Sequence, residues 1–95
     1  MVSEGRSRLT ATLIHQFLVA AYKLGDPMYG SGVIRMEEVG REIGVHDRDL
    51  LEKITRILVI NKDLRPDPET NEINMFRVTR QGRGKVHRWR REGQA

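Results

Sequence analysis

Apolar residues return every three or four positions between residues 9 and 24, which is the spacing of one helix face. Gly25, Asp26 and Pro27 follow directly. Because proline cannot continue a helix and glycine suits the residue just past its end, the pattern predicts a first helix that stops there. The apolar stripe of this helix comprises Leu9, Leu13, Phe17, Ala20 or Ala21, and Leu24, widened by Ile14 and Leu18.

A second apolar pattern, over residues 34–58, predicts two short helices joined by a tight turn. Val39 and Ile43 are four residues apart and therefore lie on one face of the first of these helices. Gly40 lies beside them and has no side chain that would hold another helix away. Gly44 is expected to end this helix, because a residue with φ > 0 just past a last turn is normally glycine.

The second helix of the pair is predicted to start at Asp47, after Val45 fills the corner. The Asp47 carboxylate can accept hydrogen bonds from the free backbone N–H groups of a first turn, so it is a good N-cap. The apolar stripe of this helix comprises Leu50, Leu51, Ile54, Ile57 and Leu58.

Short β-strands are predicted on either side of the helix pair, at residues 33–34 and from residues 64–65. Residues 66–71 have the composition of a turn, and residues 73–78 are rich in β-formers and would return as the second strand of a hairpin. Two prolines before the turn would confine the first hairpin strand to a sheet edge and keep it short. Residues 28–32, which contain two glycines, are expected to be a flexible connector.

A last helix is expected near the C-terminus. Thr79 can cap it, and Val86 and Trp89, three residues apart, would be its apolar contacts, with Trp89 pinning the helix to the core. The glycines within residues 82–84 each cost about 1 kcal/mol of helix propensity relative to alanine. This helix is therefore predicted to form only from Lys85 onward.

The helix pair resembles the helix-turn-helix of DNA-binding proteins. The resemblance rests on Val39-Gly40, then Ile43-Gly44-Val45, then Leu50 five residues later. One departure is that an apolar residue usually stands three positions after Leu50, where this chain has Lys53. A hairpin directly after such a pair is the wing of a winged-helix domain, and residues 78–83 resemble the segment that closes the wing in many bacterial winged-helix regulators.

The resemblance implies an α+β winged-helix fold: a three-helix core with the helix-turn-helix, a wing of two or three β-strands, and a short basic C-terminal helix. Residues 1–95 are expected to form a single domain, because a chain of this length has room for one modest core. Residues 1–7 would be a disordered lead and residues 92–95 a frayed tail. Such regulators often dimerise through helices outside the winged unit, so a homodimer stays open.

The composition argues against several classes of function. The chain has no cysteine, which excludes a disulfide framework and a thiolate metal site. His15, His46 and His87 are scattered, with no spacing suited to a metal, and neither a Gly-x-Ser-x-Gly elbow nor a cysteine nucleophile is present. We therefore expect no enzyme activity, no metal site and no cofactor. The apolar stretches are too short to cross a bilayer and the N-terminus lacks a signal-peptide core, so a soluble cytoplasmic protein is expected.

The excess of positive charge is confined to the end of the chain. Residues 1–76 carry ten Lys or Arg against twelve Asp or Glu, whereas residues 77–95 carry seven against one, which together give the net charge of +4. A localised cationic segment is a footprint for a polyanion. Solvated basic tails have the same composition, so the charge alone does not choose between the two.

Double-stranded DNA is the partner that best fits these patterns, for a small transcriptional regulator of bacterial or archaeal type. A major-groove reader presents the start of its second helix to base edges, where Arg48, Lys53 and Arg56 would read bases. The remaining DNA contacts would come from the hairpin and the C-terminal segment, at Arg65, Arg77, Arg80, Arg83, Lys85 and Arg88.

Acidic residues leave two other partners open. Asp47, Asp49 and Glu52 oppose the cations of the second helix, and acidic residues also flank the predicted wing tip, where bare Arg or Lys is expected for a minor groove. One alternative is a winged helix that meets another protein without touching DNA. The other is RNA or single-strand binding through the arginine-rich tail, with Trp89 stacking on an unpaired base.

Overall fold

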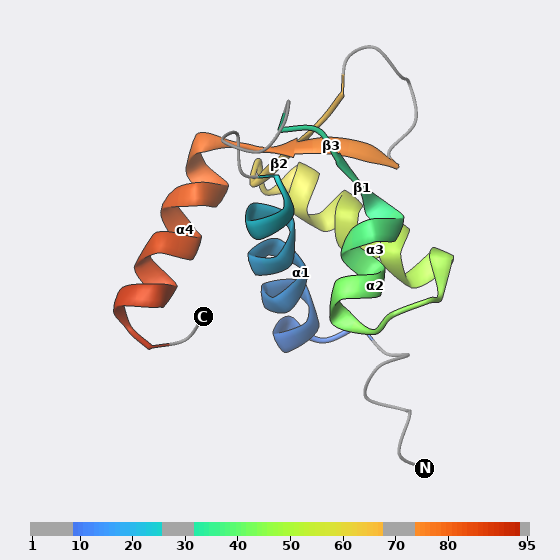
Figure 1. Cartoon of the computed structure of the whole chain (residues 1–95), viewed down its shortest axis with the longest axis horizontal. Helices are drawn as coiled ribbons and strands as arrows, with labels where there is room; N and C mark the ends of the chain where they lie inside the picture. The colour runs from blue at the N-terminus through green and yellow to red at the C-terminus, as the bar shows by residue number, and fades with distance from the viewer. Residues whose placement is uncertain (1–8, 26–31, 68–73, 94–95) are drawn as a thin grey trace.

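The computed structural model describes residues 9–25, 32–67 and 74–93. These residues form four helices and one three-stranded antiparallel sheet, which places the protein in the α+β class (Figure 1). The elements in chain order are α1 (Ala11–Leu24), β1 (Ile34–Arg35), α2 (Met36–Ile43), α3 (Arg48–Ile60), β2 (Leu64–Pro66), β3 (Met75–Val78) and α4 (Arg80–Arg91).

Helix α1 follows the predicted stripe, except at its two ends. The Thr10 side chain caps the helix by accepting a hydrogen bond from the backbone N–H of Leu13 at 3.0 Å. Leu13, Phe17, Ala20 and Ala21 are buried. Leu9 precedes the cap and Leu24 closes the helix, and both are exposed, so the predicted stripe was too long in both directions.

The helix pair forms as predicted, with Gly44 in the left-handed region at φ 75° and the backbone N–H of Val45 donating to the Gly40 carbonyl at 2.8 Å. A Cβ on Gly40 would lie 2.7 Å from a methyl carbon of Leu51, so glycine is what lets α2 and α3 approach this closely. The Asp47 carboxylate caps α3. Ile57, predicted in the buried stripe of α3, is only half-buried.

The sheet has the strand order β1-β3-β2, so β3 is central and β2 is an edge strand, as its proline predicts. Strand β1 starts one residue later than predicted. Strand β3 starts at Met75 within the described part of the chain. The predictions for residues 1–7, 26–31, 68–73 and 94–95 lie outside the described residues.

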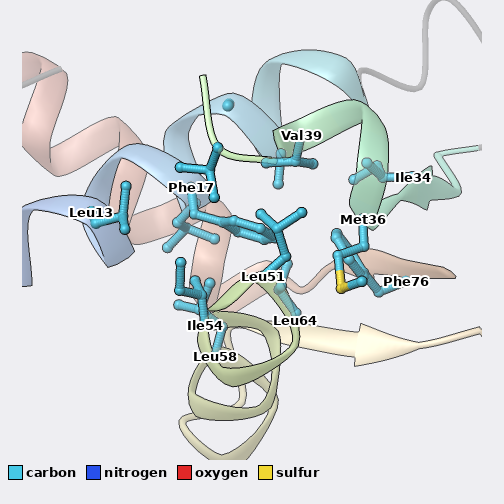
Figure 2. Close-up of a cluster of buried hydrophobic side chains, with 14 of the residues drawn as sticks. Leu13, Phe17, Ile34, Met36, Val39, Leu51, Ile54, Leu58, Leu64 and Phe76 are labelled. Atoms are coloured by element: carbon cyan, nitrogen blue, oxygen red, sulfur yellow. The ribbon is translucent and has the colours of Figure 1, made fainter. Parts of the chain in front are cut away.

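The core lies between the three helices α1, α2 and α3 and one face of the sheet (Figure 2). Phe17 of α1 and Phe76 of β3 are fully buried, with ring centroids 5.9 Å apart. Leu64 of β2 is also buried. Because neighbouring residues of a strand point to opposite faces, Arg65 and Arg77 project from the other face of the sheet.

Helix α4 begins at Arg80, five residues before the predicted start, so the prediction that the two glycines delay it was wrong. Thr79 caps it by accepting a hydrogen bond from the backbone N–H of Gly82 at 3.0 Å. A Cβ on Gly82 would collide with the backbone oxygen of Asp63. The packing that glycine permits at this position offsets its low helix propensity.

Stacked and hydrogen-bonded side chains join α4 to α1. Trp89 stacks on His15 with ring centroids 3.8 Å apart, which confirms that Trp89 pins the last helix to the core. The hydroxyl of Tyr22 is hydrogen-bonded to Nε2 of His87 at 2.7 Å. At the far end of α4, Gly93 donates its backbone N–H to the Arg90 carbonyl.

Candidate nucleic-acid interface

The exposed face of α3 carries two of the predicted base-reading cations. Lys53 and Arg56 are exposed, three residues apart, and lie opposite the stripe that α3 buries in the core. Neither side chain makes an ion pair within the described residues. Both side chains are therefore available to a partner.

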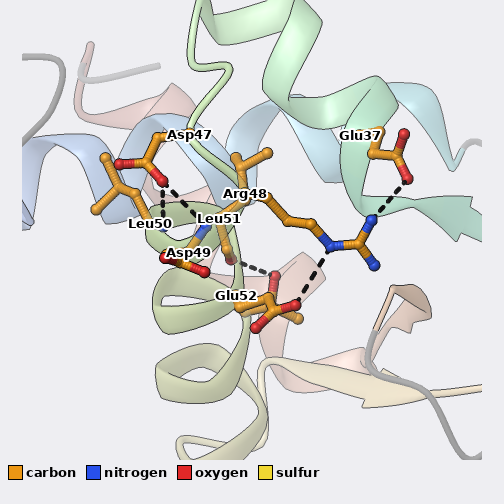
Figure 3. Close-up of polar contacts among 8 residues, drawn as sticks. Glu37, Asp47, Arg48, Asp49, Leu50, Leu51 and Glu52 are labelled. Atoms are coloured by element: carbon orange, nitrogen blue, oxygen red, sulfur yellow. Dashed lines mark hydrogen bonds and ion pairs between the residues drawn. The ribbon is translucent and has the colours of Figure 1, made fainter.

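Arg48, the third predicted base-reading residue, is held by two carboxylates of its own chain (Figure 3). Its guanidinium lies 3.8 Å from Glu37 of α2 and 3.4 Å from Glu52, one turn further along α3. Arg48 and Glu37 are exposed and Glu52 is about one-third exposed, and ion pairs of this kind contribute about 0–1 kcal/mol. Arg48 can therefore exchange these partners for an external anion at small cost.

The cationic C-terminal segment does not form one surface, because α4 distributes it over several faces. Gly82, Val86 and Trp89 face inward. On one flank of that inward stripe, at helical spacing, lie Arg80, Arg83, His87 and Arg90. On the other flank lie Gln81, Lys85 and Arg88.

Asp63, which sequence analysis overlooked, fixes the second flank of α4. Its carboxylate is 2% exposed and binds the Lys85 ammonium at 2.7 Å and the Gln81 amide at 3.0 Å. The Asp63 backbone oxygen also accepts the N–H of Thr79 at 3.0 Å. Lys85, predicted to contact DNA, is thus occupied in attaching α4 to the end of α3. The sequence offered no signal for this pairing, which joins residues 22 positions apart.

A cleft of about 370 Å³ lies on the first flank of α4, and four arginines line it. We call it the arginine cleft. Its described lining contains no carboxylate and no residue of α3. The lining residues are Tyr22, Gly25, Gly32, Arg65, Arg77, Val78, Thr79, Arg80 and Arg83.

Two of these arginines face each other across the hairpin. Arg65 of β2 and Arg77 of β3 are directly opposite in the strand register. Like charges in this position destabilise a sheet. A Cβ on Gly32, whose φ is +83°, would lie 3.4 Å from a terminal nitrogen of Arg77, so the backbone passes close to that guanidinium. The two guanidinium groups therefore lie near each other on the face of the sheet that points away from the core.

The structure thus divides the nine predicted contact residues among four places. Arg48, Lys53 and Arg56 lie on α3; Arg65, Arg77, Arg80 and Arg83 line the arginine cleft; Lys85 binds Asp63; and Arg88 is exposed on the second flank of α4. Sequence analysis named the four cleft arginines but not Tyr22 or Gly32 beside them, because these residues are distant from the arginines in the chain and meet them only in the folded protein.

Within the described residues, no cluster of three or more His, Asp or Glu side chains could hold a metal ion. No described helix is both long enough and apolar enough to span a membrane. A comparison with protein-family models found no match, and searches among curated proteins and solved structures found none either.

Proposed function

We propose that this protein is a winged-helix domain that binds double-stranded DNA with the exposed face of α3. The observation that carries the proposal is the succession of a helix pair with a glycine corner, an exposed second helix bearing Lys53 and Arg56, and an antiparallel hairpin directly after it. In such an arrangement the second helix is free to enter a major groove, which is wide enough to admit an α-helix.

In this proposal the Lys and Arg side chains of α3 contact the base edges of the DNA. Lys53 and Arg56 extend from α3 toward base edges and the adjacent phosphates, and Arg48 exchanges Glu37 and Glu52 for DNA. Arg88 lies on the α4 flank that also carries Gln81, whose amide donates to the Asn61 carbonyl at the end of α3. Arg88 is therefore the C-terminal cation best placed to add a phosphate contact beside α3.

Fluorescence anisotropy with random-sequence duplex DNA tests the proposal. We expect micromolar or tighter binding at low salt, with the logarithm of the affinity falling linearly with the logarithm of salt concentration. Arg56→Gln should weaken binding about three- to tenfold and flatten the salt dependence. Lys23→Gln, which removes an equal charge from the exposed end of α1, is the matched control and should leave both unchanged.

A protein partner is the second candidate, because carboxylates outnumber cations at the start of α3. Arg48 pairs with two carboxylates there, and Asp49 is exposed beside it. Phosphates are repelled by such carboxylates, whereas a protein surface of mixed charge can pair with them. Absence of duplex binding even at low salt would contradict the first proposal, and a pull-down with the intact chain would then be the next experiment.

Single-strand binding through Trp89 receives no support from the packing. The indole already stacks on His15, and Val86, one turn earlier, is fully buried. Stacking on an unpaired base would require Trp89 to leave this contact.

A further inference from the structure

We propose that Ile60, the last residue of α3, contacts the C5-methyl group of a thymine in the major groove. The inference rests on the DNA binding proposed above and adds a base preference to it. It is drawn from the exposure of Ile60, from the charge around it and from the chemistry of base edges.

Ile60 is the most exposed large hydrophobic side chain in the described part of the chain. It is 77% exposed, against 43% for Leu9 and 40% for Leu24. Lys53 and Arg56 precede it at helical spacing, so all three side chains lie on one outward stripe of α3. An aliphatic side chain is therefore part of the face that presents these two cations.

The C-terminal half of α3 is the part of the helix that attracts a polyanion. Residues 53–62 contain three cations and no carboxylate, whereas residues 48–52 contain two carboxylates and one cation. Glu52, the carboxylate nearest to this half, pairs with Arg48 (Figure 3). Phosphates drawn to the stripe around Ile60 would bring the isoleucine to the base edges that lie between them. This charge favours DNA over a protein surface as the occupant.

The carbonyl groups at the end of α3 offer little negative charge to oppose phosphates, because other groups of the chain bind them. The carbonyls of residues 57, 58 and 59 accept the backbone N–H groups of residues 61, 63 and 62. The Gln81 amide donates to the Asn61 carbonyl, and the Thr79 hydroxyl donates to the Lys62 carbonyl, both at 2.6 Å. The negative end of the α3 dipole, which resides on unsatisfied carbonyls, is thus largely compensated within the protein.

The methyl group of thymine is the apolar feature that base edges present in the major groove. Isoleucine neither donates nor accepts hydrogen bonds, so this methyl group is the feature that Ile60 can recognise. With a helix rise of about 1.5 Å per residue, Ile60 lies about 6 Å beyond Arg56 along α3. Where α3 follows the groove, at about 3.4 Å per base pair, the thymine lies about two base pairs from the base edge at Arg56.

Anisotropy titrations with two alternating duplexes, one of A·T pairs and one of A·U pairs, test the proposal. Both duplexes carry the same phosphate charge, and they differ in the methyl group of each thymine. At one salt concentration, we expect the protein to bind the A·T duplex about three- to fivefold more tightly, as for the burial of one methyl group. A G·C duplex that contains 5-methylcytosine should exceed its unmethylated counterpart by a similar factor.

Two variants assign this preference to one side chain. Ile60→Ala should bind the A·T and A·U duplexes equally, because the alanine side chain ends at Cβ. The high exposure of Ile60 predicts that this variant folds normally, and its Tm checks that. Leu24→Ala is the matched control: it shortens an exposed aliphatic side chain at the end of α1 and should keep the preference for the A·T duplex.

Two results would overturn the thymine contact and leave DNA binding in place. The protein could bind the A·T and A·U duplexes equally, or Ile60→Ala could keep the full preference for A·T, which would assign the preference to duplex shape. If the protein binds no duplex even at low salt, the proposed DNA binding fails and this inference fails with it.

Discussion

At the scale of single residues, two glycines in the first turns of α4 have opposite effects on stability. Gly82 is buried, and its α-carbon packs against the backbone oxygen of Asp63, where a methyl group has no room. Gly84 is exposed, and a Cβ there would meet no atom within 4 Å apart from the neighbouring backbone of its own helix. The first glycine is required by packing, and the second only lowers the helix propensity of α4.

Alanine substitutions at these two positions should therefore change the free energy of unfolding in opposite directions. Gly82→Ala should lower it by about 1–3 kcal/mol, because backbone atoms must shift to admit the methyl group. Gly84→Ala should raise it by about 0.5–1 kcal/mol through helix propensity alone. Urea unfolding of the two variants checks this prediction. Equal effects of the same sign would show that the contact with Asp63 is not tight.

The same two glycines explain why the start of α4 could not be predicted from the sequence. Helix propensity counts both glycines as destabilising, and for that reason the predicted start of α4 was placed at Lys85. Whether a glycine is a cost or a requirement depends on what lies against it, and Asp63 is 19 positions away in the chain. Gly44 was predictable, since its role at a helix end follows from the local backbone alone.

At the scale of elements, the attachment of α4 depends on the buried carboxylate of Asp63. Lys85 and Gln81 bind its two oxygens, and the hydroxyl of Thr79 donates to the neighbouring Lys62 carbonyl at 2.6 Å. These contacts fix where α4 starts, and hence where Arg80 and Arg83 enter the arginine cleft.

Replacing Lys85 by methionine should destabilise the protein by about 1–3 kcal/mol, because a buried carboxylate loses its countercharge while the aliphatic packing is largely kept. The partial exposure of Lys85 keeps the effect below that of a fully buried pair. Lys53→Met, on the exposed face of α3, is the control and should change stability by less than about 0.5 kcal/mol. Chemical denaturation measures both, and an equal response would contradict the role given to Asp63.

The elements themselves were largely predictable, because each is specified by neighbouring residues. Apolar spacing predicted α1 and α3, Thr10 and Asp47 have the side chains of helix caps, and proline predicted an edge strand for β2. The errors lie at the ends of elements: Leu9 and Leu24 continue the apolar spacing of α1, but both side chains are exposed.

At the scale of the whole molecule, folding divides the positive charge that the sequence concentrates in residues 77–95. The periodicity of α4 sends Arg80 and Arg83 to one flank and Arg88 to the other, and the hairpin register adds Arg65 to the first group. The sequence therefore predicted which Arg and Lys residues to consider, but not their separation between the exposed face of α3 and the arginine cleft. The division depends on contacts between segments distant in the chain.

If the two surfaces act separately, substitutions in them should have additive effects on duplex affinity. Arg56→Gln should reduce that affinity by the same factor whether residue 77 is Arg or Gln, within about 0.5 kcal/mol. Anisotropy titrations of the two single variants and the double variant give this comparison. A coupling larger than about 1 kcal/mol would indicate that one duplex contacts both surfaces.

The stacking of Trp89 on His15 also makes the intrinsic tryptophan fluorescence a probe of how α4 packs on α1. Trp89 is the single tryptophan of the chain, and it lies half-buried where α4 meets α1. Its fluorescence emission therefore reports on the contact between α4 and α1. A variant in which α4 detaches while the remaining helices stay folded would shift the emission to longer wavelength before the far-ultraviolet circular dichroism changes. Label-free fluorescence can thus distinguish local release of α4 from global unfolding.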